Sequence, residues 1–148
     1  MIYESTNIEE LKKLGNFSKY ISADLITRGL VQAEIGILRK WMGLKAVAEF
    51  NDYPDEIKQN IHKSLALLAN AWVMKNSTFT TRSGAVEKQN SAESKVLSSA
   101  ELSRQASQLR IEAMQIMKHT EELIVEQGLP PFEWSKEDNI LGLWFQSF

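Results

Sequence analysis

The chain has 148 residues, of which 43% are hydrophobic and 24% charged, with a net charge of −2 and no cysteine. This composition is typical of one globular domain with its own core, and it excludes disulfides and thiolate chemistry. The charge argues against broad electrostatic binding to nucleic acid. No apolar run approaches the ~20 residues of a membrane-spanning helix, and residues 1–10 lack a signal-peptide pattern, so we expect a cytosolic origin.

The first third of the chain predicts two helices. Thr6–Glu9 fits a capping box, which predicts a short helix that runs to Leu14 and stops at Gly15. A second helix should begin near Ser22 and carry two apolar faces, so it should be central in the fold or contact another subunit. The first face comprises Ile26, Leu30, Ala33, Ile37 and Trp41, and the second comprises Val31, Ile35, Leu38 and Met42.

Three glycines mark this second helix. Gly29 and Gly36 each cost up to ~1 kcal/mol relative to alanine. They lie seven residues apart, on about the same side, and would permit a close helix approach. Simple tolerance of glycine is the plainer interpretation. Gly43 should end or kink the helix.

A third helix is predicted from the start signal around Pro54. Asp52 offers a cap, and Asp55 and Glu56 place acidic side chains at the positive end of the helix dipole. The helix should run to about Lys75. Its expected buried face comprises Ile57, Ile61, Leu65, Leu68 and Trp72.

A polar stretch, Asn76–Leu97, follows the third helix. Ser77–Thr81 has the threonines and the aromatic residue of a strand, Arg82–Gly84 is a turn signal, and Ala85–Lys88 could return as a second strand. We therefore predict a β-hairpin at about residues 77–88. Because a lone hairpin is marginal in water, it should pack on something or be mobile.

The fourth predicted helix is long. Ser98 and Glu101 form a capping box, and Gly128 with Pro130 beyond it marks the end. A narrow seam runs along the helix, and core packing is its plain interpretation, with a binding site for another chain as the alternative. The seam comprises Leu102, Leu109, Ile116 and Leu123, interleaved with Ala106, Ala113 and Thr120.

The end of the chain is aromatic. We divide the chain into a helical domain, 1–135, and a tail, 136–148. Trp144, Phe145 and Phe148 in the tail should either cover the chain's own core or dock on a partner, because aromatic residues are the usual interface anchors.

Motifs for catalysis, metals or cofactors are not found in the sequence. His62 lies beside the apolar face of its helix and His119 lies between seam positions, so both fit surface or boundary positions. Gly84 is isolated and forms no phosphate-binding loop, and two histidines suggest no triad. We therefore predict no catalytic, metal-binding or cofactor-binding residues, and no enzyme.

The order of the predicted elements and a few residues resemble those of a known protein family over about residues 5–135. The residues concerned are Ala69–Trp72, Phe79-Thr80-Thr81, Gly84-Ala85-Val86, Ala92, Leu102–Leu123 with Arg110 and Ala113, and Phe132-Glu133-Trp134. In these features the chain resembles the head–tail connector (adaptor, or head-completion) proteins of tailed bacteriophages.

The resemblance implies a fold and an assembly. The fold would be mainly α, a small helical bundle with a protruding β-hairpin between the third helix and the long fourth helix. Copies would form a ring, commonly a dodecamer, beneath the portal protein, extending the DNA channel and joining head to tail. The implied partners are the other copies, the portal protein, a downstream neck or tail protein, and DNA that passes without specific binding, with no membrane. The implied location is the virion neck, after assembly in the host cytoplasm.

The resemblance also implies contact residues. In the family, the polar segment after the third helix reaches a neighbouring subunit or a portal or tail component. Here that role falls on Phe79, Thr80, Thr81, Arg82, Gly84 and Val86, and docking by the tail would fall on Trp144, Phe145 and Phe148. Two other hypotheses remain: a helical adaptor or regulatory module that binds a partner helix through the Leu102–Leu123 seam, and a small helical enzyme with a deep polar pocket.

Overall fold

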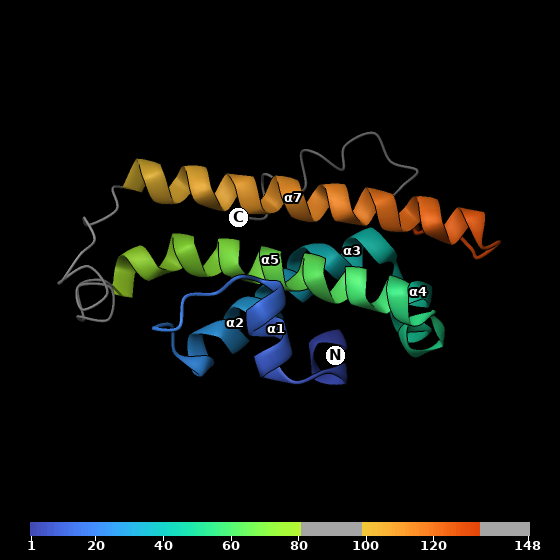
Figure 1. The fold of residues 1–148 in the computed structure, drawn as a ribbon, viewed down its shortest axis with the longest axis horizontal. Helices are drawn as coiled ribbons and strands as arrows, with labels where there is room; N and C mark the ends of the chain where they lie inside the picture. The colour runs from blue at the N-terminus through green and yellow to red at the C-terminus, as the bar shows by residue number, and fades with distance from the viewer. Residues whose placement is uncertain (81–98, 134–148) are drawn as a thin grey trace.

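The protein is built from helices packed around one central helix, as a computed structural model that describes residues 1–80 and 99–133 shows (Figure 1). The central helix is α5 (Asp55–Thr80), and α7 (Ser99–Glu126) runs antiparallel along one side of it. Residues 2–5, 8–14 and 23–33 pack on α5 from the other side, and they belong to a series of short helices in the first half. In chain order these are η1 (Ile2–Ser5), α1 (Ile8–Leu14), α2 (Ala23–Ala33), the π-helix η2 (Glu34–Leu38), α3 (Arg39–Met42), α4 (Leu44–Ala48) and η3 (Phe50–Asp52). The mainly-α class is confirmed.

The predicted β-hairpin is wrong. Residues 77–80, expected to begin its first strand, form the last turn of α5, and residues 1–80 and 99–133 contain no strand. Extending a helix fixes one residue for each backbone hydrogen bond gained, whereas an isolated hairpin is marginal in water. Threonine and phenylalanine prefer strands only weakly, so the preceding helix prevails.

Helix starts follow the predicted signals closely. Asn7, rather than Thr6, caps α1 by accepting the Glu10 N–H at 2.8 Å. Ser22 caps α2 by accepting the Leu25 N–H at 3.2 Å, and α5 begins directly after Pro54. Each cap satisfies a backbone donor that has no partner inside its helix.

The core is centred on α5, which is buried on several sides. Its predicted face is confirmed except at its last position, Trp72, which is only half-buried. Fully burying a Leu or Ile side chain contributes about 1.5–3 kcal/mol, so this helix supplies much of the driving force for folding. The buried residues of α5 are Ile57, Ile61, Ser64, Leu65, Ala66, Leu67, Leu68, Ala69, Asn70, Ala71 and Val73.

The seam of α7 packs against the chain's own core, but its centre differs from the prediction. The fully buried line alternates steps of four and three residues, as in a coiled coil. The predicted leucines and Ile116 flank this line and are half-buried. Small residues at the centre let α7 approach α5 closely, and the Ser64 hydroxyl donates to the Ala113 carbonyl at 3.3 Å. The buried line comprises Ala106, Arg110, Ala113, Met117, Thr120 and Ile124.

The end of α7 turns the chain back to the core. Gly128 adopts a left-handed conformation (φ 72°), and the Leu129 N–H donates to the Ile124 carbonyl at 2.9 Å. This is the glycine stop that the sequence predicts. Phe132 then inserts fully into the core, edge-on to Tyr53, with ring centroids 6.4 Å apart.

The two faces of the Ala23–Met42 segment end in different environments. All five residues of the first face are buried, which confirms it. On the second face Leu38 and Met42 are buried, but Ile35 is 52% exposed. The π-turn at η2 adds one residue to the helical turn, so positions around it rotate off the straight-helix pattern. The segment packs on α5, as expected of a central helix.

Gly29, but not Gly36, permits a close helix contact. A Cβ atom at Gly29 would lie 2.9 Å from the Ala69 carbonyl oxygen and 3.0 Å from Val73 Cγ2, whereas one at Gly36 would meet nothing within 4 Å. The close-approach hypothesis is therefore correct for the first glycine only.

We predict opposite effects of alanine at these two positions. Gly29→Ala should destabilise the protein by about 1–3 kcal/mol, because α2 must move away from the α5 backbone. Gly36→Ala, the matched control, should be neutral or stabilise by up to ~1 kcal/mol through helix propensity. Denaturant unfolding of the two variants measures both effects. Equal destabilisation of the two would contradict the close contact.

Candidate functional site

The predicted contact residues lie almost entirely outside the described residues. Phe79 and Thr80 lie in the last turn of α5. The remainder, Thr81, Arg82, Gly84, Val86, Trp144, Phe145 and Phe148, lie in residues 81–98 and 134–148, as does the boundary between the predicted domain and tail. Their role as an interface stays a prediction.

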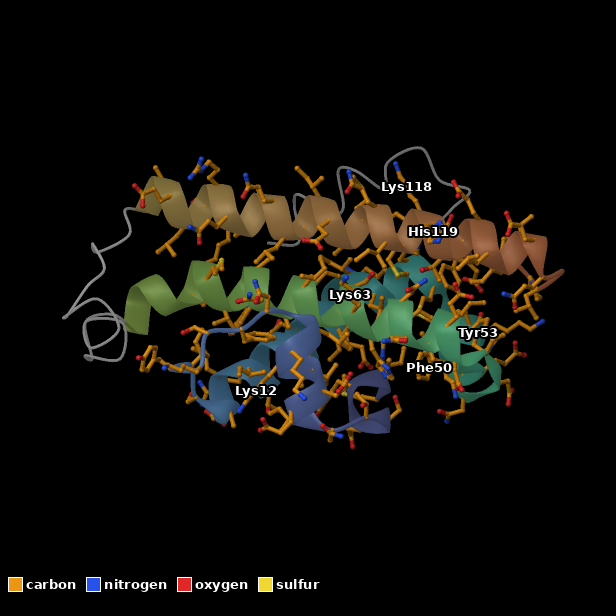
Figure 2. All side chains as sticks on the ribbon, in the orientation of Figure 1. Lys12, Phe50, Tyr53, Lys63, Lys118 and His119 are labelled. Atoms are coloured by element: carbon orange, nitrogen blue, oxygen red, sulfur yellow. The ribbon has the colours of Figure 1, made fainter. Side chains whose placement is uncertain are left out.

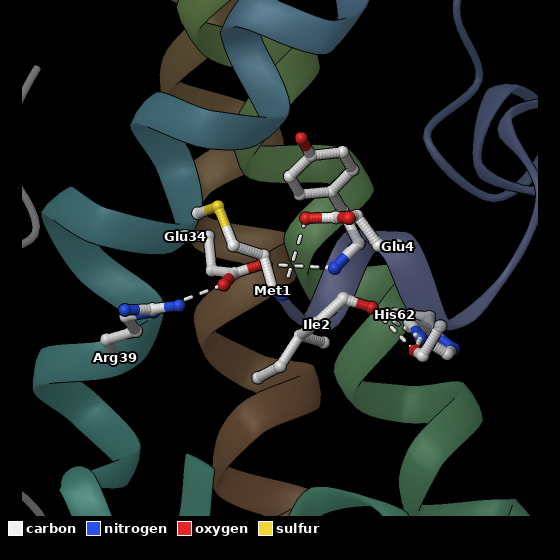
Figure 3. A network of polar contacts seen from close by, with 8 residues as sticks. Met1, Ile2, Glu4, Glu34, Arg39 and His62 are labelled. Atoms are coloured by element: carbon white, nitrogen blue, oxygen red, sulfur yellow. Dashed lines mark hydrogen bonds and ion pairs between the residues drawn. The ribbon is translucent and has the colours of Figure 1, made fainter. Parts of the chain in front are cut away.

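The most elaborate polar cluster of the described residues joins η1, η2 and α5 (Figure 3). Its centre is Glu34, a carboxylate with 0% exposure. One carboxylate oxygen accepts the Tyr3 backbone N–H at 3.0 Å, and the other accepts the Arg39 Nε–H at 3.2 Å. A buried carboxylate needs such partners, because an unpartnered one costs several kcal/mol.

The π-turn explains how a glutamate enters the core. The Arg39 N–H donates to the Glu34 carbonyl, five residues back, which widens the turn. Glu34 and Arg39 thereby lie close enough to pair, although their spacing is not the usual three or four residues. Sequence reasoning missed this site, because Glu34 interrupts an apolar pattern and nothing in the local sequence indicates a π-turn.

His62 forms the other half of the cluster. Its Nε2 atom lies 2.8 Å from Ser5 Oγ and 3.4 Å from the Ile2 carbonyl oxygen, and the Phe50 ring stands edge-on to the imidazole at 5.2 Å between centroids. Burial lowers the pKa of His62, and the charge of Lys58 lowers it further. The hydrogen bond to the Ile2 carbonyl and the charge of Glu34 raise this pKa, but by less than burial lowers it. His62 is half-buried, as predicted for a boundary residue, whereas His119 is exposed on α7 (Figure 2).

Ser5 and His62 do not form a nucleophile–base pair. The Ser5 hydroxyl donates to the Ile2 carbonyl at 2.5 Å, so its proton points away from the imidazole. The Ile2 carbonyl can only accept, so Nε2 carries a proton and donates to both oxygens. A histidine that donates to a serine cannot act as its general base. The contact therefore holds η1 in place.

A shallow pocket of about 160 Å³ lies beside η1. It is too small for most drug-sized ligands, whose sites span ~300–1,000 Å³. Its lining contains both polar and apolar side chains, and it brings together no pair of catalytic side chains. The lining residues are Tyr3, Glu4, Thr6, Ile8, Leu11, Thr27 and Leu30.

Two further charged side chains lie in the packing of α7. The Trp41 indole N–H donates to the Glu121 carboxylate, which ties α3 to α7. Burial raises the pKa of Glu121, while this hydrogen bond and Lys118 lower it. Arg110 is buried against α5, where its guanidinium donates to Ser107 Oγ at 3.2 Å and burial lowers its pKa. Sequence reasoning singled out Arg110 only through the family likeness.

Metal binding and membrane insertion find no support in the part of the chain that the structure describes. Within residues 1–80 and 99–133, no group of three or more His, Asp or Glu side chains could hold a metal ion. The helices of the same residues include none long and apolar enough to cross a membrane.

Comparison of the chain with protein-family models, curated proteins and solved structures finds no match.

Removing Glu34 should loosen η1. Glu34→Ala leaves the Tyr3 N–H without its acceptor and opens a small cavity, so we expect a loss of about 1–3 kcal/mol in unfolding free energy. Glu122→Ala removes an exposed carboxylate on α7 and should change stability by less than about 0.5 kcal/mol. Thermal and denaturant unfolding compare the variants, and similar values for both would refute the importance of the buried carboxylate.

Proposed function

We propose that the protein is a structural virion protein, a head–tail connector subunit of a tailed bacteriophage. Copies would form a ring beneath the portal, extend the DNA channel and join head to tail. The proposal rests on the element order shared with that family. The hairpin is not part of it, since α5 continues through residues 77–80.

One structural observation supports the proposal most. The α5–α7 pair extends beyond the layer of short helices, at the end where residues 81–98 connect the two (Figure 1). At 1.5 Å per residue, the 26 residues of α5 and the 28 of α7 span about 39 and 42 Å. A stiff helix pair that carries a polar connection at its end is suited to contacting a neighbouring subunit in a ring.

Burial in the described residues favours an assembly role only for the last turns of the pair. Ala71 and Val73 of α5 and Ala106 of α7 are still fully buried. Beyond them, residues 74–76 of α5 are half-buried, and residues 100–105 of α7 are half-buried or exposed. Surface residues such as these are free to serve contacts between chains.

The adaptor hypothesis receives less support. It requires the Leu102–Leu123 seam to bind a helix from another protein. Leu109, Ile116 and Leu123 already pack against the chain's own core, and the buried line between them faces α5. A partner helix would have to displace α5, which is the most buried helix of the described fold.

A ring requires that two different surfaces of the subunit meet. We place one of them at the connection after α5, where Thr81 and Arg82 follow the last helical turn, and assign docking on a partner to Trp144, Phe145 and Phe148. Aromatic and arginine side chains are the residue types most enriched among interface anchors.

Assembly of the purified full chain tests the proposal. We expect a ring by electron microscopy and mass photometry, or a monomer that becomes a ring when mixed with portal rings encoded by the same genome. Arg82→Glu should weaken this assembly at least tenfold, and Lys118→Glu, on the exposed face of α7 (Figure 2), should not. The connector function would be overturned if the protein is a dimer at all concentrations and does not bind portal rings. It would also be overturned if the genome has no portal gene.

A further inference from the structure

The η1 strap (Ile2–Ser5) is held to the body of the protein by few contacts. It is a 3₁₀-helix of four residues, and the Glu4 N–H donates to the Met1 carbonyl at 3.1 Å at its start. Such short helices have little stability of their own. The Ile2 side chain is buried and the Tyr3 side chain packs half-buried against the core, and these two contribute the apolar part of the attachment.

The polar part of this attachment runs through the side chains of Glu34 and His62. The Tyr3 N–H donates to the Glu34 carboxylate, and His62 Nε2 donates to the Ile2 carbonyl and to Ser5 Oγ (Figure 3). Glu34 and His62 come from η2 and α5, the two elements beneath the strap. An element of marginal stability is therefore attached in part through a histidine, whose charge depends on pH.

We infer that η1 is a strap which acid releases from the body of the protein, and that His62 is the group that senses the proton. Its docked, neutral ring is covered by η1 and bordered by the Phe50 ring. A second proton would enter at Nδ1, since Nε2 is already committed as a donor, and would place a charge in a half-buried site.

The charges around His62 determine whether its protonated form is favoured in the docked state. From α5, Lys58 disfavours the imidazolium, and from η2, Glu34 favours it but is already paired with Arg39. The strap itself brings Glu4, which the Met1 ammonium contacts at 3.4 Å. From η3 the neighbouring group is Phe50, which is uncharged.

Burial is the largest of the influences on His62 and lowers its pKa below the ordinary value of 6.5. The hydrogen bond to Ile2 works the other way, since it favours the charged ring, but its effect is smaller. Release of the strap returns the ring to water, where its pKa rises again. Docking is thus fully stabilised above the ordinary histidine pKa and weakens as the pH falls towards the lower pKa of the docked state.

Release would change one surface of the molecule. It would expose the Glu34 carboxylate, leave the cavity filled by Ile2 empty, and remove two of the pocket's walls, Tyr3 and Glu4. The helices α5 and α7 would stay packed, because none of their mutual contacts involves the strap.

Amide exchange in the full chain tests this inference by NMR. His62 has one pKa with the strap released and a lower one with the strap docked. As the pH falls between these two values, we expect the protection factor of the Tyr3 amide to fall by up to about tenfold per pH unit. The fall should level off at the pH at which the His62 ring resonance titrates. The protection of Leu65, in the buried centre of α5, should stay constant. Loss of protection at Tyr3 and Leu65 together would mean global acid unfolding and would overturn the inference.

The two histidines of the chain provide a matched pair of variants. His62→Gln keeps a donor but cannot charge, so it should abolish the pH dependence at Tyr3 over the histidine range. His119→Gln removes the exposed histidine and should leave it unchanged. An unaltered pH dependence in His62→Gln would assign the release to another group and refute the role of His62. Should His62→Gln fail to fold, a fall at Tyr3 in the native chain that does not level off at the titration midpoint of the His62 ring refutes it equally.

Discussion

The whole arrangement depends on close approach to the backbone of α5. Over a short central stretch this helix presents small residues, each to a different neighbour. Ser64 donates to the Ala113 carbonyl of α7, the end of α1 approaches Ala66 at Gly15, and α2 approaches Ala69 at Gly29. A Cβ atom at Gly15 would lie 2.7 Å from the Ala66 carbonyl oxygen. Three neighbours can surround one helix only because both sides of each contact are small.

This constraint explains why apolar periodicity was a good guide to the helices and a poorer guide to their contacts. The spacing of Ile57, Ile61 and Leu65 predicts a buried face, and all three are fully buried. On α7, the large side chains place the predicted seam at Leu109 and Ile116, although these are half-buried and Ala113 is fully buried. Alanine carries little hydrophobic signal, so periodicity alone cannot show where two helix backbones come closest.

The failures of prediction have a common physical cause, which is that tertiary context overrides local preference. Residues 77–80 have strand-forming side chains but continue a helix that is already nucleated. Glu34 interrupts an apolar face but enters the core, because a π-turn brings Arg39 within reach and η1 supplies a backbone donor. Both outcomes depend on groups that are distant in sequence or on a helix already formed. The contact residues after Thr80 and in the tail stay predictions.

Charged side chains inside the described fold mark where its parts join. Glu34 joins η1 to η2, Glu121 joins α7 to α3, and Arg110 lies where α7 covers α5. Apolar residues of similar volume often stabilise such positions equally well or better, so buried charges are weak evidence of stability. Their effect is better understood as fixing register, since a carboxylate that must meet one backbone N–H tolerates no slip of a helical turn. In the ring subunit that we propose, such precision would have a direct use, because a small error in the direction of the α5–α7 pair would be repeated at every subunit and would prevent closure.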